Sequence, residues 1–293
     1  MKRVIVVGAG PAGVSAALYA RSRGCDVTVF EAEAVGGLIG KVSKVSHFAS
    51  CVVDETGPHF AERMIQQLEA ANIPVRFERV SKVCHHEDRF EVITKKNSYA
   101  PDKVIIATGS EPKELPIDCP ENVRVRHFAL GEEDRVKDRV VVMNGGSDGA
   151  IKEALYLAKF AKTVHIVQDQ PQLLCIDEFR RALDEADNIE IHLGTKVQAF
   201  ETEDDTVRAV RLANGDMIED DAGIDVFVLI GQAGYAEPVA HLLDVEGDNF
   251  IAADSVETEI PGLYVAGDVR TKTVRQVATA VSDGCLAGIL AAK

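Results

Sequence analysis

The sequence predicts an α/β protein made of two doubly wound, three-layer domains, and three observations support this. Residues 3–31 and 139–167 both show the pattern of a strand, a glycine-rich turn, a helix and a second strand. That order is typical of a parallel sheet with layers packed on both of its faces. The chain has 293 residues, of which 46% are hydrophobic and 27% charged. This length is enough for two domains of about 100–200 residues each.

The first unit begins with an apolar, β-branched strand at residues 3–7. The loop Gly8-Ala9-Gly10-Pro11-Ala12-Gly13 follows, a helix runs over residues 14–23, and a strand at 26–30 ends on Glu31. Gly8 permits a tight turn, Gly10 lets the backbone approach a pyrophosphate, and Gly13 lets helix and strand touch. The free amides of the helix N-terminus favour phosphate, and Glu31 is placed to accept ribose hydroxyls. The pattern therefore predicts a dinucleotide site.

The rest of the chain continues the alternation of strands and helices. A strand ends at Ile105–Gly109, and the stretch 111–116, with two prolines, breaks regular structure as a linker would. The second unit has a strand at 139–143, a glycine loop at 144–149, a helix over 150–161 and a strand at 163–167. Strands at 226–230 and 263–266 and a helix over 275–291 complete the pattern. We assign residues 1–113 and 245–293 to the first domain and residues 114–244 to an inserted second domain.

Several motifs spread over essentially the full chain carry a family resemblance. They are the loop 8–13, Gly36-Gly37, Ala107-Thr108-Gly109, Ile260-Pro261-Gly262, Ala266-Gly267-Asp268, and the run Arg275-Gln276-Val277-Ala278-Thr279-Ala280. In these motifs the sequence resembles the low-molecular-weight thioredoxin-reductase-like flavoproteins, which are class II pyridine nucleotide-disulfide oxidoreductases. The resemblance implies a homodimer with FAD in the first domain.

The resemblance also implies which residues hold FAD. Asp268 would bond the ribityl chain, the backbone of Gln276 and Val277 would lie near the flavin ring, and Val83 would lie beside the adenine. The full set implied to contact the cofactor is Gly8, Gly10, Pro11, Ala12, Gly13, Glu31, Ala32, Gly36, Gly37, Leu38, Val83, Ala107, Thr108, Gly109, Gly267, Asp268, Arg275, Gln276 and Val277. No catalytic side chain is assigned, and no metal site is expected.

The second glycine loop departs from the family pattern. Asn144 replaces the first glycine, while Gly145, Gly146 and Gly149 remain. NADPH-specific relatives carry a His-Arg-Arg run after the next strand, but here Gln168-Asp169-Gln170 follows. Asp169 would repel a 2′-phosphate and could accept ribose hydroxyls. We expect NADH to be favoured over NADPH, with a domain that has lost nucleotide binding as the alternative.

The redox dithiol of the family is also missing. Six cysteines lie at separations of 26 residues or more, so the chain has no Cys-x-x-Cys pair. The segment 122–130, which includes His127, occupies the place of the dithiol. A relay from flavin to a disulfide by that route needs a second sulfur to resolve the mixed disulfide. Cys51, which follows the Gly36-Gly37 pair, is the lone candidate thiol near the flavin.

Charge narrows the class of partners. The net charge of −15 disfavours nucleic acid and anionic membrane surfaces. The apolar runs are also too short for a membrane span or a signal-peptide core, so we expect a cytoplasmic protein. Near the expected flavin, however, basic residues gather, which suggests docking of an acidic redox protein such as a ferredoxin or flavodoxin. These residues are Lys41, Lys44, Arg270, Lys272 and Arg275.

The sequence therefore favours an FAD-dependent oxidoreductase that works without a Cys-x-x-Cys dithiol. Its flavin would be reduced by NADH or by a ferredoxin- or flavodoxin-like carrier, and it would pass electrons to an acceptor that the sequence does not name. The alternatives are a flavin-binding regulatory or interaction protein that has lost catalysis, and a thioredoxin or disulfide reductase that uses non-standard cysteines.

Overall fold

The computed structural model describes residues 1–87, 89–120 and 123–293, and they form two compact units. Unit 1 comprises Met1–Glu111 and Ala233–Lys293, and unit 2 comprises Pro112–Gln232. The second boundary lies 12 residues earlier than the sequence suggested, because Ala236 and Val239 are buried in the same core cluster of unit 1 as Val83. The chain passes between the units at β8 (Ser110–Pro112) and β16 (Gln232–Gly234), which pair with each other.

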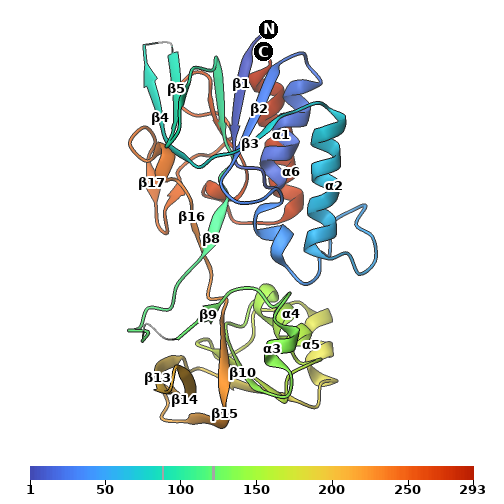
Figure 1. Ribbon diagram of the computed structural model, residues 1–293, viewed down its shortest axis with the longest axis vertical. Coiled ribbons are helices and arrows are strands. Elements are labelled where there is room, and N and C mark those ends of the chain that lie inside the picture. Colours follow the sequence, from blue (N-terminus) through green and yellow to red (C-terminus); the bar gives the residue numbers. More distant parts are fainter. Residues whose placement is uncertain (88, 121–122) are drawn as a thin grey trace. The chain divides into compact units, whose positions relative to one another are not determined.

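Unit 1 is built around a parallel five-stranded sheet in the order β19-β7-β1-β2-β3 (Figure 1). Successive residues of β1 point to opposite faces, so Val4 and Val6 join one core cluster while Ile5 and Val7 join another. The strands are β1 (Arg3–Val7), β2 (Asp26–Glu31), β3 (Val75–Phe77), β7 (Lys103–Ile106) and β19 (Leu263–Val265).

Helices cover one face of this sheet and a second, antiparallel sheet covers the other. The helices are α1 (Pro11–Arg21), α2 (Gly57–Ala70) and α6 (Val277–Ala291). The covering sheet consists of β4 (Val80–His86), β5 (Arg89–Thr94) and β6 (Ser98–Tyr99). The remaining elements are the hairpin of β17 (Val245–Glu246) and β18 (Phe250–Ile251) and the 3-10 helices η1 (Gly37–Lys41), η2 (Glu237–Val239) and η3 (Gly267–Val269).

Unit 2 repeats the three-layer plan. Its sheet runs β12-β11-β10-β15-β14-β13, with β9 also paired to β15. The strands are β9 (Val125–Arg126), β10 (Val140–Asn144), β11 (Thr163–Gln168), β12 (Ile189–Leu193), β13 (Val197–Glu203), β14 (Thr206–Leu212) and β15 (Met217–Val228). The helices are α3 (Glu133–Val136), α4 (Asp148–Leu157) and α5 (Asp177–Asp184). Two doubly wound domains are confirmed. Among the described residues, no helix is long and apolar enough to cross a bilayer.

Candidate functional site

The first glycine loop is a tight turn that leaves space in front of it. The amide of Gly8 donates to the carbonyl oxygen of Phe30 at 2.7 Å. A Cβ on Gly13 would lie 1.9 Å from the carbonyl oxygen of Gly8, so only glycine fits there. A Cβ on Gly10, by contrast, would meet only the Gly36 oxygen, at 3.9 Å. Within the described chain no side chain caps α1, which starts at Pro11, so its first amides remain available to a phosphate.

Glu31 is fixed beside this loop by two backbone amides. Its Oε2 accepts a hydrogen bond from the Ala9 amide at 2.7 Å, and its Oε1 accepts one from the Glu33 amide at 2.9 Å. The intervening residue, Ala32, is exposed. The Gly36 amide donates to the Ala9 oxygen at 2.9 Å. These bonds place Glu31 and the Gly36-Gly37 pair, followed by Leu38, next to the loop.

The segment Ala107-Thr108-Gly109 closes the other side of the loop. The Ala107 amide donates to the Val7 oxygen at 2.8 Å, and a Cβ on Gly8 would lie 2.2 Å from the Ala107 oxygen. Thr108 Oγ1 donates to the Tyr235 oxygen at 2.7 Å, and the Tyr235 amide donates to the Gly109 oxygen at 3.1 Å. Val83 lies in β4 and is fully buried, so the contact with adenine that the resemblance implies stays a prediction.

Asp268 lies in η3 with one carboxylate oxygen short of hydrogen bonds. Its Oδ1 is buried and lies 3.2 Å from Lys272 Nζ, but among the described residues no donor makes a hydrogen bond of good geometry to it. Burial raises the pKa of Asp268, although the Lys272 ammonium acts in the opposite direction. A buried acceptor without a donor fits a ligand hydroxyl.

The N-terminus of α6 is ordered by its own side chains. Gln276 and Thr279 form a reciprocal capping box, so the helix begins at Val277. The Arg275 guanidinium carbon lies 3.8 Å above the centre of the Phe250 ring. These contacts hold the Arg275–Val277 backbone, which the sequence placed near the flavin ring.

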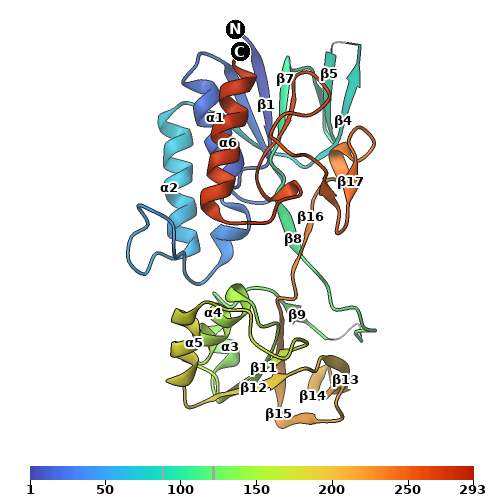
Figure 2. The ribbon, with the colours of Figure 1, turned by 180° about the vertical axis from the view of Figure 1, so that it is seen from behind.

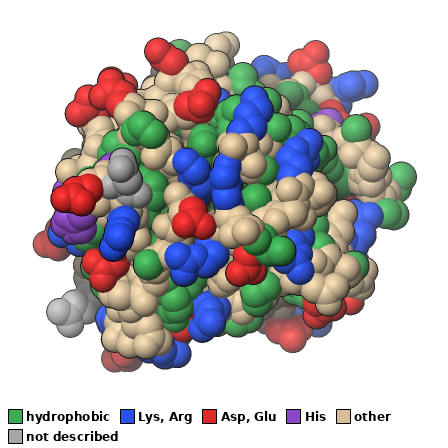
Figure 3. All heavy atoms as spheres, turned by 90° about the horizontal axis from the view of Figure 1, so that it is seen from above, with side chains coloured by type: hydrophobic (Ala, Val, Ile, Leu, Met, Phe, Trp, Pro, Cys, Tyr) green, Lys and Arg blue, Asp and Glu red, His purple; other side chains and the backbone are tan. Residues whose placement is uncertain are grey.

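The basic residues that the sequence grouped as a docking patch all have partners. Lys41 Nζ lies 2.8 Å from Glu33 Oε2, and Lys44 Nζ lies 3.0 Å from Asp54 Oδ1. Arg270 forms an ion pair with Asp283, and Lys272 forms one with Asp268. The Arg275 guanidinium lies over the Phe250 ring. The face that carries both termini is a different part of the surface, and there too lysine and arginine side chains are interspersed with acidic and apolar ones (Figure 3). Each of the five basic side chains thus has an acidic or aromatic partner within the chain, and docking of an acidic redox protein on them stays a prediction.

The second glycine loop is shifted by one residue from the sequence-based alignment. The Gly145 amide donates to the Val167 oxygen at 2.8 Å, and Gly145 has a φ of 137°. A Cβ on Gly145 would lie 2.3 Å from the Leu229 oxygen, just as one on Gly8 would meet Ala107. Gly145 therefore corresponds to Gly8, whereas Asn144 is the last residue of β10. The turn glycine is present after all.

This register changes which residues would meet a nucleotide in unit 2. Counting from Gly145, Ser147 takes the place of Gly10 and Ala150 that of Gly13. Because Asn144 is in register with Val167 as Val7 is with Phe30, Gln168 takes the place of Glu31. Asp169 is one residue further along and exposed. At the position where Glu31 offers a carboxylate to the ribose, unit 2 therefore has the neutral amide of Gln168. At the position where Gly10 leaves room for the pyrophosphate, unit 2 has the side chain of Ser147.

A neighbouring segment also differs between the two loops. The Leu174 amide donates to the Gly146 oxygen at 2.8 Å, in the way that Gly36 donates to Ala9 in unit 1. Gly146 itself is packed against Gln168, since a Cβ there would lie 2.8 Å from Gln168 Cδ. Asp148 places a carboxylate in the first turn of α4 and accepts the Ile176 amide at 2.8 Å. A negative charge at this helix end opposes a pyrophosphate.

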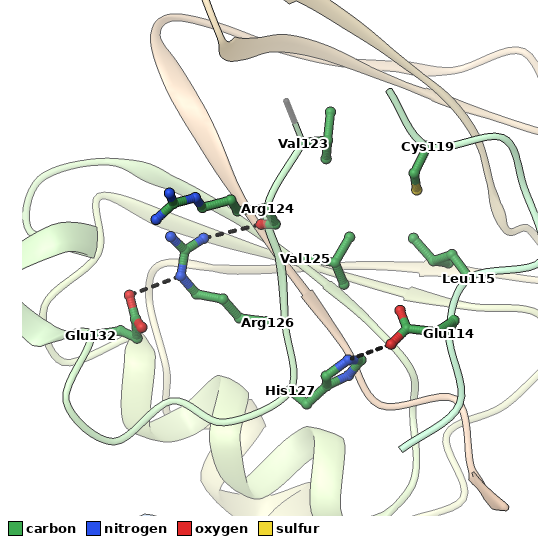
Figure 4. A pocket seen from close by; sticks show the side chains of 9 residues that line it. All are labelled: Glu114, Leu115, Cys119, Val123, Arg124, Val125, Arg126, His127 and Glu132. Atoms are coloured by element: carbon green, nitrogen blue, oxygen red, sulfur yellow. Dashed lines mark hydrogen bonds and ion pairs between the residues drawn. The ribbon is translucent and has the colours of Figure 1, made fainter. Parts of the chain in front are cut away.

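Residues of the segment that the sequence analysis placed at the position of the family's dithiol line a pocket of about 540 Å³ within unit 2 (Figure 4). His127 Nε2 points to Glu114 Oε1 at 3.5 Å, and its Nδ1 lies 2.8 Å from the Val228 oxygen. Arg126 on the same wall binds Glu132 at 2.9 Å. Asn122, the first residue of the segment 122–130, lies outside the described residues.

Neither Cys119 at this pocket nor Cys51 in unit 1 is an activated nucleophile. Cys119 lines the pocket, and burial raises the pKa of its thiol. Burial and, next, the Glu55 carboxylate raise the pKa of the Cys51 thiol. A raised pKa reduces the thiolate fraction at neutral pH, and the thiolate is the reactive species.

Comparison with known proteins decides the family. The sequence profile of the pyridine nucleotide-disulphide oxidoreductases matches residues 2–284. The chain belongs to this family. It is 32% identical over 292 residues to a thioredoxin reductase of Mycoplasma genitalium, a match that covers 97% of this chain and 92% of that protein. It is also 31% identical over 301 residues to a 34.2 kDa protein in the rubredoxin operon of Clostridium pasteurianum, covering 99% and 96%.

The fold comparison agrees with the sequence comparison. The crystal structure of thioredoxin reductase from Lactococcus lactis superposes with a TM-score of 0.92 at 26% identity, covering 98% of this chain and 97% of that chain. The chain is thus a thioredoxin-reductase-like flavoprotein oxidoreductase. Its place in the family confirms the prediction of an enzyme with two dinucleotide-binding domains.

Proposed function

We propose that this chain is an FAD-dependent oxidoreductase whose flavin is reduced by a small carrier protein and which passes electrons on without a Cys-x-x-Cys dithiol. The supporting observation is the contrast between two loops of one design. In unit 1 the position where the backbone approaches the pyrophosphate is Gly10, and the position that would bind the ribose is Glu31. The residue whose amide bonds to the loop from the neighbouring segment is Gly36. In unit 2 the corresponding residues are Ser147, Gln168 and Leu174. The first loop is suited to a dinucleotide and the second is not.

The residues of unit 1 fit FAD, which supplies the electron-transfer chemistry when bound. The α1 amides and the Gly10 backbone would bind the pyrophosphate. The Glu31 carboxylate would accept the ribose hydroxyls, and Asp268 Oδ1 would accept a ribityl hydroxyl in place of its missing hydrogen bond. The N-terminus of α6 would place the partial positive charge of the helix dipole beside the ring, which favours the reduced, anionic state. By the same resemblance we propose a homodimer.

A carrier as electron donor is favoured by two further facts. By the family resemblance the segment 122–130, which includes His127, takes the place of the dithiol, and no two cysteines of the chain are close in sequence. A relative at 31% identity is described as a protein in a rubredoxin operon. Both facts suit a flavoprotein that exchanges electrons with a small redox protein, and we propose a ferredoxin or flavodoxin as that class of donor.

We expect reduced ferredoxin or flavodoxin to bleach the visible flavin band of the holoprotein under anaerobic conditions, and NADPH to leave it unchanged. The reason is that the NADPH-binding positions of unit 2 carry Ser147, Asp148 and an uncharged Gln168. Stopped-flow absorbance measures the reaction, with dithionite as the positive control. Rapid bleaching by NADH would contradict the carrier proposal. Bleaching by dithionite alone would favour a flavin-binding interaction protein.

Replacing Glu31 with glutamine should weaken FAD binding. Glu31 accepts two backbone amides, and the carboxylate also has lone pairs for ribose hydroxyls. The glutamine amide offers one oxygen and turns its NH₂ toward a backbone donor. Loss of one charge-assisted bond costs about 1.5–3 kcal/mol, or roughly 10–150-fold in affinity. Fluorescence titration of the apoprotein with FAD measures this. The matched control is Gln168→Glu in unit 2, which should leave the affinity for FAD unchanged.

A further inference from the structure

Two histidines and a glutamate on neighbouring strands bring three metal-ligating atoms together in unit 2. His165 lies in β11, and Glu190 and His192 lie in β12, the edge strand that runs parallel to it (Figure 2). His165 is in register with Glu190, and His192 is two residues further along the same strand. Since side chains alternate along a strand, all three project from one face of the sheet.

The distances between these atoms match the coordination shell of a small divalent ion. His165 Nδ1 lies 3.1 Å from His192 Nε2 and 3.4 Å from Glu190 Oε2, and all three atoms lie within 4.8 Å of one another. Tetrahedral Zn²⁺ with ligands at about 2.0–2.2 Å needs ligand atoms roughly 3.3–3.5 Å apart. The 3.4 Å between His165 Nδ1 and Glu190 Oε2 falls in this range. The 3.1 Å between the two imidazole nitrogens is a hydrogen-bond distance about 0.2 Å short of it, so the histidines would move apart slightly around an ion.

The surroundings also suit a metal centre with one open position. The His165 side chain is 13% exposed, so one wall of the cluster is formed by protein, whereas Glu190 is 63% exposed on the edge strand. Water can therefore reach the remaining coordination position. Two imidazoles and one carboxylate are a donor set that Zn²⁺ accepts, with water as the fourth ligand.

We propose that His165, Glu190 and His192 bind one Zn²⁺ ion, which ties the edge strand β12 to β11. This site is separate from the nucleotide loops and does not depend on the proposed function. A second cluster, Cys84, His86 and Glu91 in the β4–β5 hairpin, also brings three ligand atoms within 4.8 Å of one another. We favour the histidine pair because its two imidazole nitrogens face each other at 3.1 Å, close to the spacing that Zn²⁺ needs.

The test is metal binding by the full-length protein after treatment with a chelator. We expect one Co²⁺ per chain with tetrahedral absorption bands, displaced by Zn²⁺, and a higher melting temperature with Zn²⁺. His192→Ala should abolish the bands. Glu190→Gln, on an exposed edge where the fold should tolerate it, should weaken binding by more than the roughly 10–100-fold that loss of an outer-sphere partner costs.

The matched controls lie in the competing hairpin. His86→Ala and Cys84→Ser should leave the Co²⁺ bands and the stoichiometry unchanged. The proposal is overturned if the full-length chain binds no Co²⁺ or Zn²⁺ at micromolar concentrations. It is equally overturned if the bands survive His192→Ala, or if a thiolate-to-cobalt charge-transfer band shows the ion on Cys84.

Discussion

Gly10→Ala should remove FAD binding while leaving the apoprotein as stable as the parent. A methyl group there meets only the Gly36 oxygen at 3.9 Å, so the fold has room for it. The same methyl projects into the space through which a pyrophosphate approaches the backbone. We expect an affinity loss of 100-fold or more, on the order of the 2.7 kcal/mol or more that two displaced hydrogen bonds to a charged group represent. Titration with FAD and chemical denaturation of the apoprotein measure the two effects separately.

Gly13→Ala is the contrasting variant, because its methyl meets backbone rather than open space. The Cβ would lie 1.9 Å from the Gly8 oxygen, and neither α1 nor β1 can yield without disturbing the core. Overpacking of this kind costs about 1–3 kcal/mol or more, so this variant should lose both stability and flavin. Equal loss of stability in the two variants would show that Gly10 is a structural residue and not a ligand-facing one.

Unit 2 offers an internal control for the same reasoning. Gly149 lies at the position that the sequence analysis took for the last glycine of the loop motif, yet a Cβ there would meet only Leu229 Cδ2, at 3.7 Å. Gly149→Ala should therefore leave both stability and FAD content unchanged.

The first unit could be predicted because its information is local. A β-branched strand, three glycines at fixed spacing and an acid at the next strand end all lie within 31 residues, and each has its own physical reason. The second unit could not be aligned from sequence, because Asn144-Gly145-Gly146 allows two registers. Only the pairing of β10 with β11 and the Gly145 amide on Val167 show that Gly145 makes the turn and Gln168 follows Val167.

The residues that sequence reasoning misjudged or missed depend on partners far along the chain. The sequence grouped Lys272 with the basic residues expected to dock a redox protein, but its ammonium group lies 3.3 Å from Asp283, a buried residue of α6. The cluster of His165 with Glu190 and His192 joins residues 25 and 27 positions apart through a parallel strand pair. Neither arrangement leaves a short sequence motif, so no metal was expected. The signal available was Glu190 and His192 at alternate positions, but the strand that carries them was not among those predicted from the sequence.

Asp283→Asn should cause the largest loss of stability that a single isosteric change produces in unit 1. Asp283 is buried, and its carboxylate holds Arg270 with two hydrogen bonds at 2.8 and 3.0 Å and accepts the Gly267 amide at 3.0 Å. Lys272 Nζ lies 3.3 Å away. Removing one charge from a buried pair leaves the other uncompensated, which costs about 3–5 kcal/mol. Urea denaturation of the parent and the variant measures the difference.

Asp268→Asn is the control, and it should lower the affinity for FAD without lowering the stability of the apoprotein. Burial raises the pKa of Asp268, so its ionised form opposes folding, and a neutral amide should leave the apoprotein equally or more stable. The amide lacks the charge that would bind the ribityl hydroxyl, so FAD affinity should fall. A loss of stability as large as that of Asp283→Asn would mean that Asp268 is a structural partner of Lys272 instead of a ligand contact.

The two aspartates should also differ in their pH dependence, with signs set by the direction of each shift. The pKa of Asp283 is lowered, because hydrogen bonds from Arg270 and the charges of Lys272 and Arg270 outweigh the larger single effect of burial. The contribution of the Asp283 carboxylate to the free energy of unfolding is complete above its unfolded-state pKa of about 3.9. It is lost as pH falls through the lower pKa of the folded state. The raised pKa of Asp268 means that its ionisation removes stability as pH rises from about 3.9 to the folded value. Acid denaturation of the apoprotein should therefore become less steep in Asp283→Asn. The Asp268→Asn variant should not lose stability as pH rises above about 3.9, as the parent does, because the amide does not ionise.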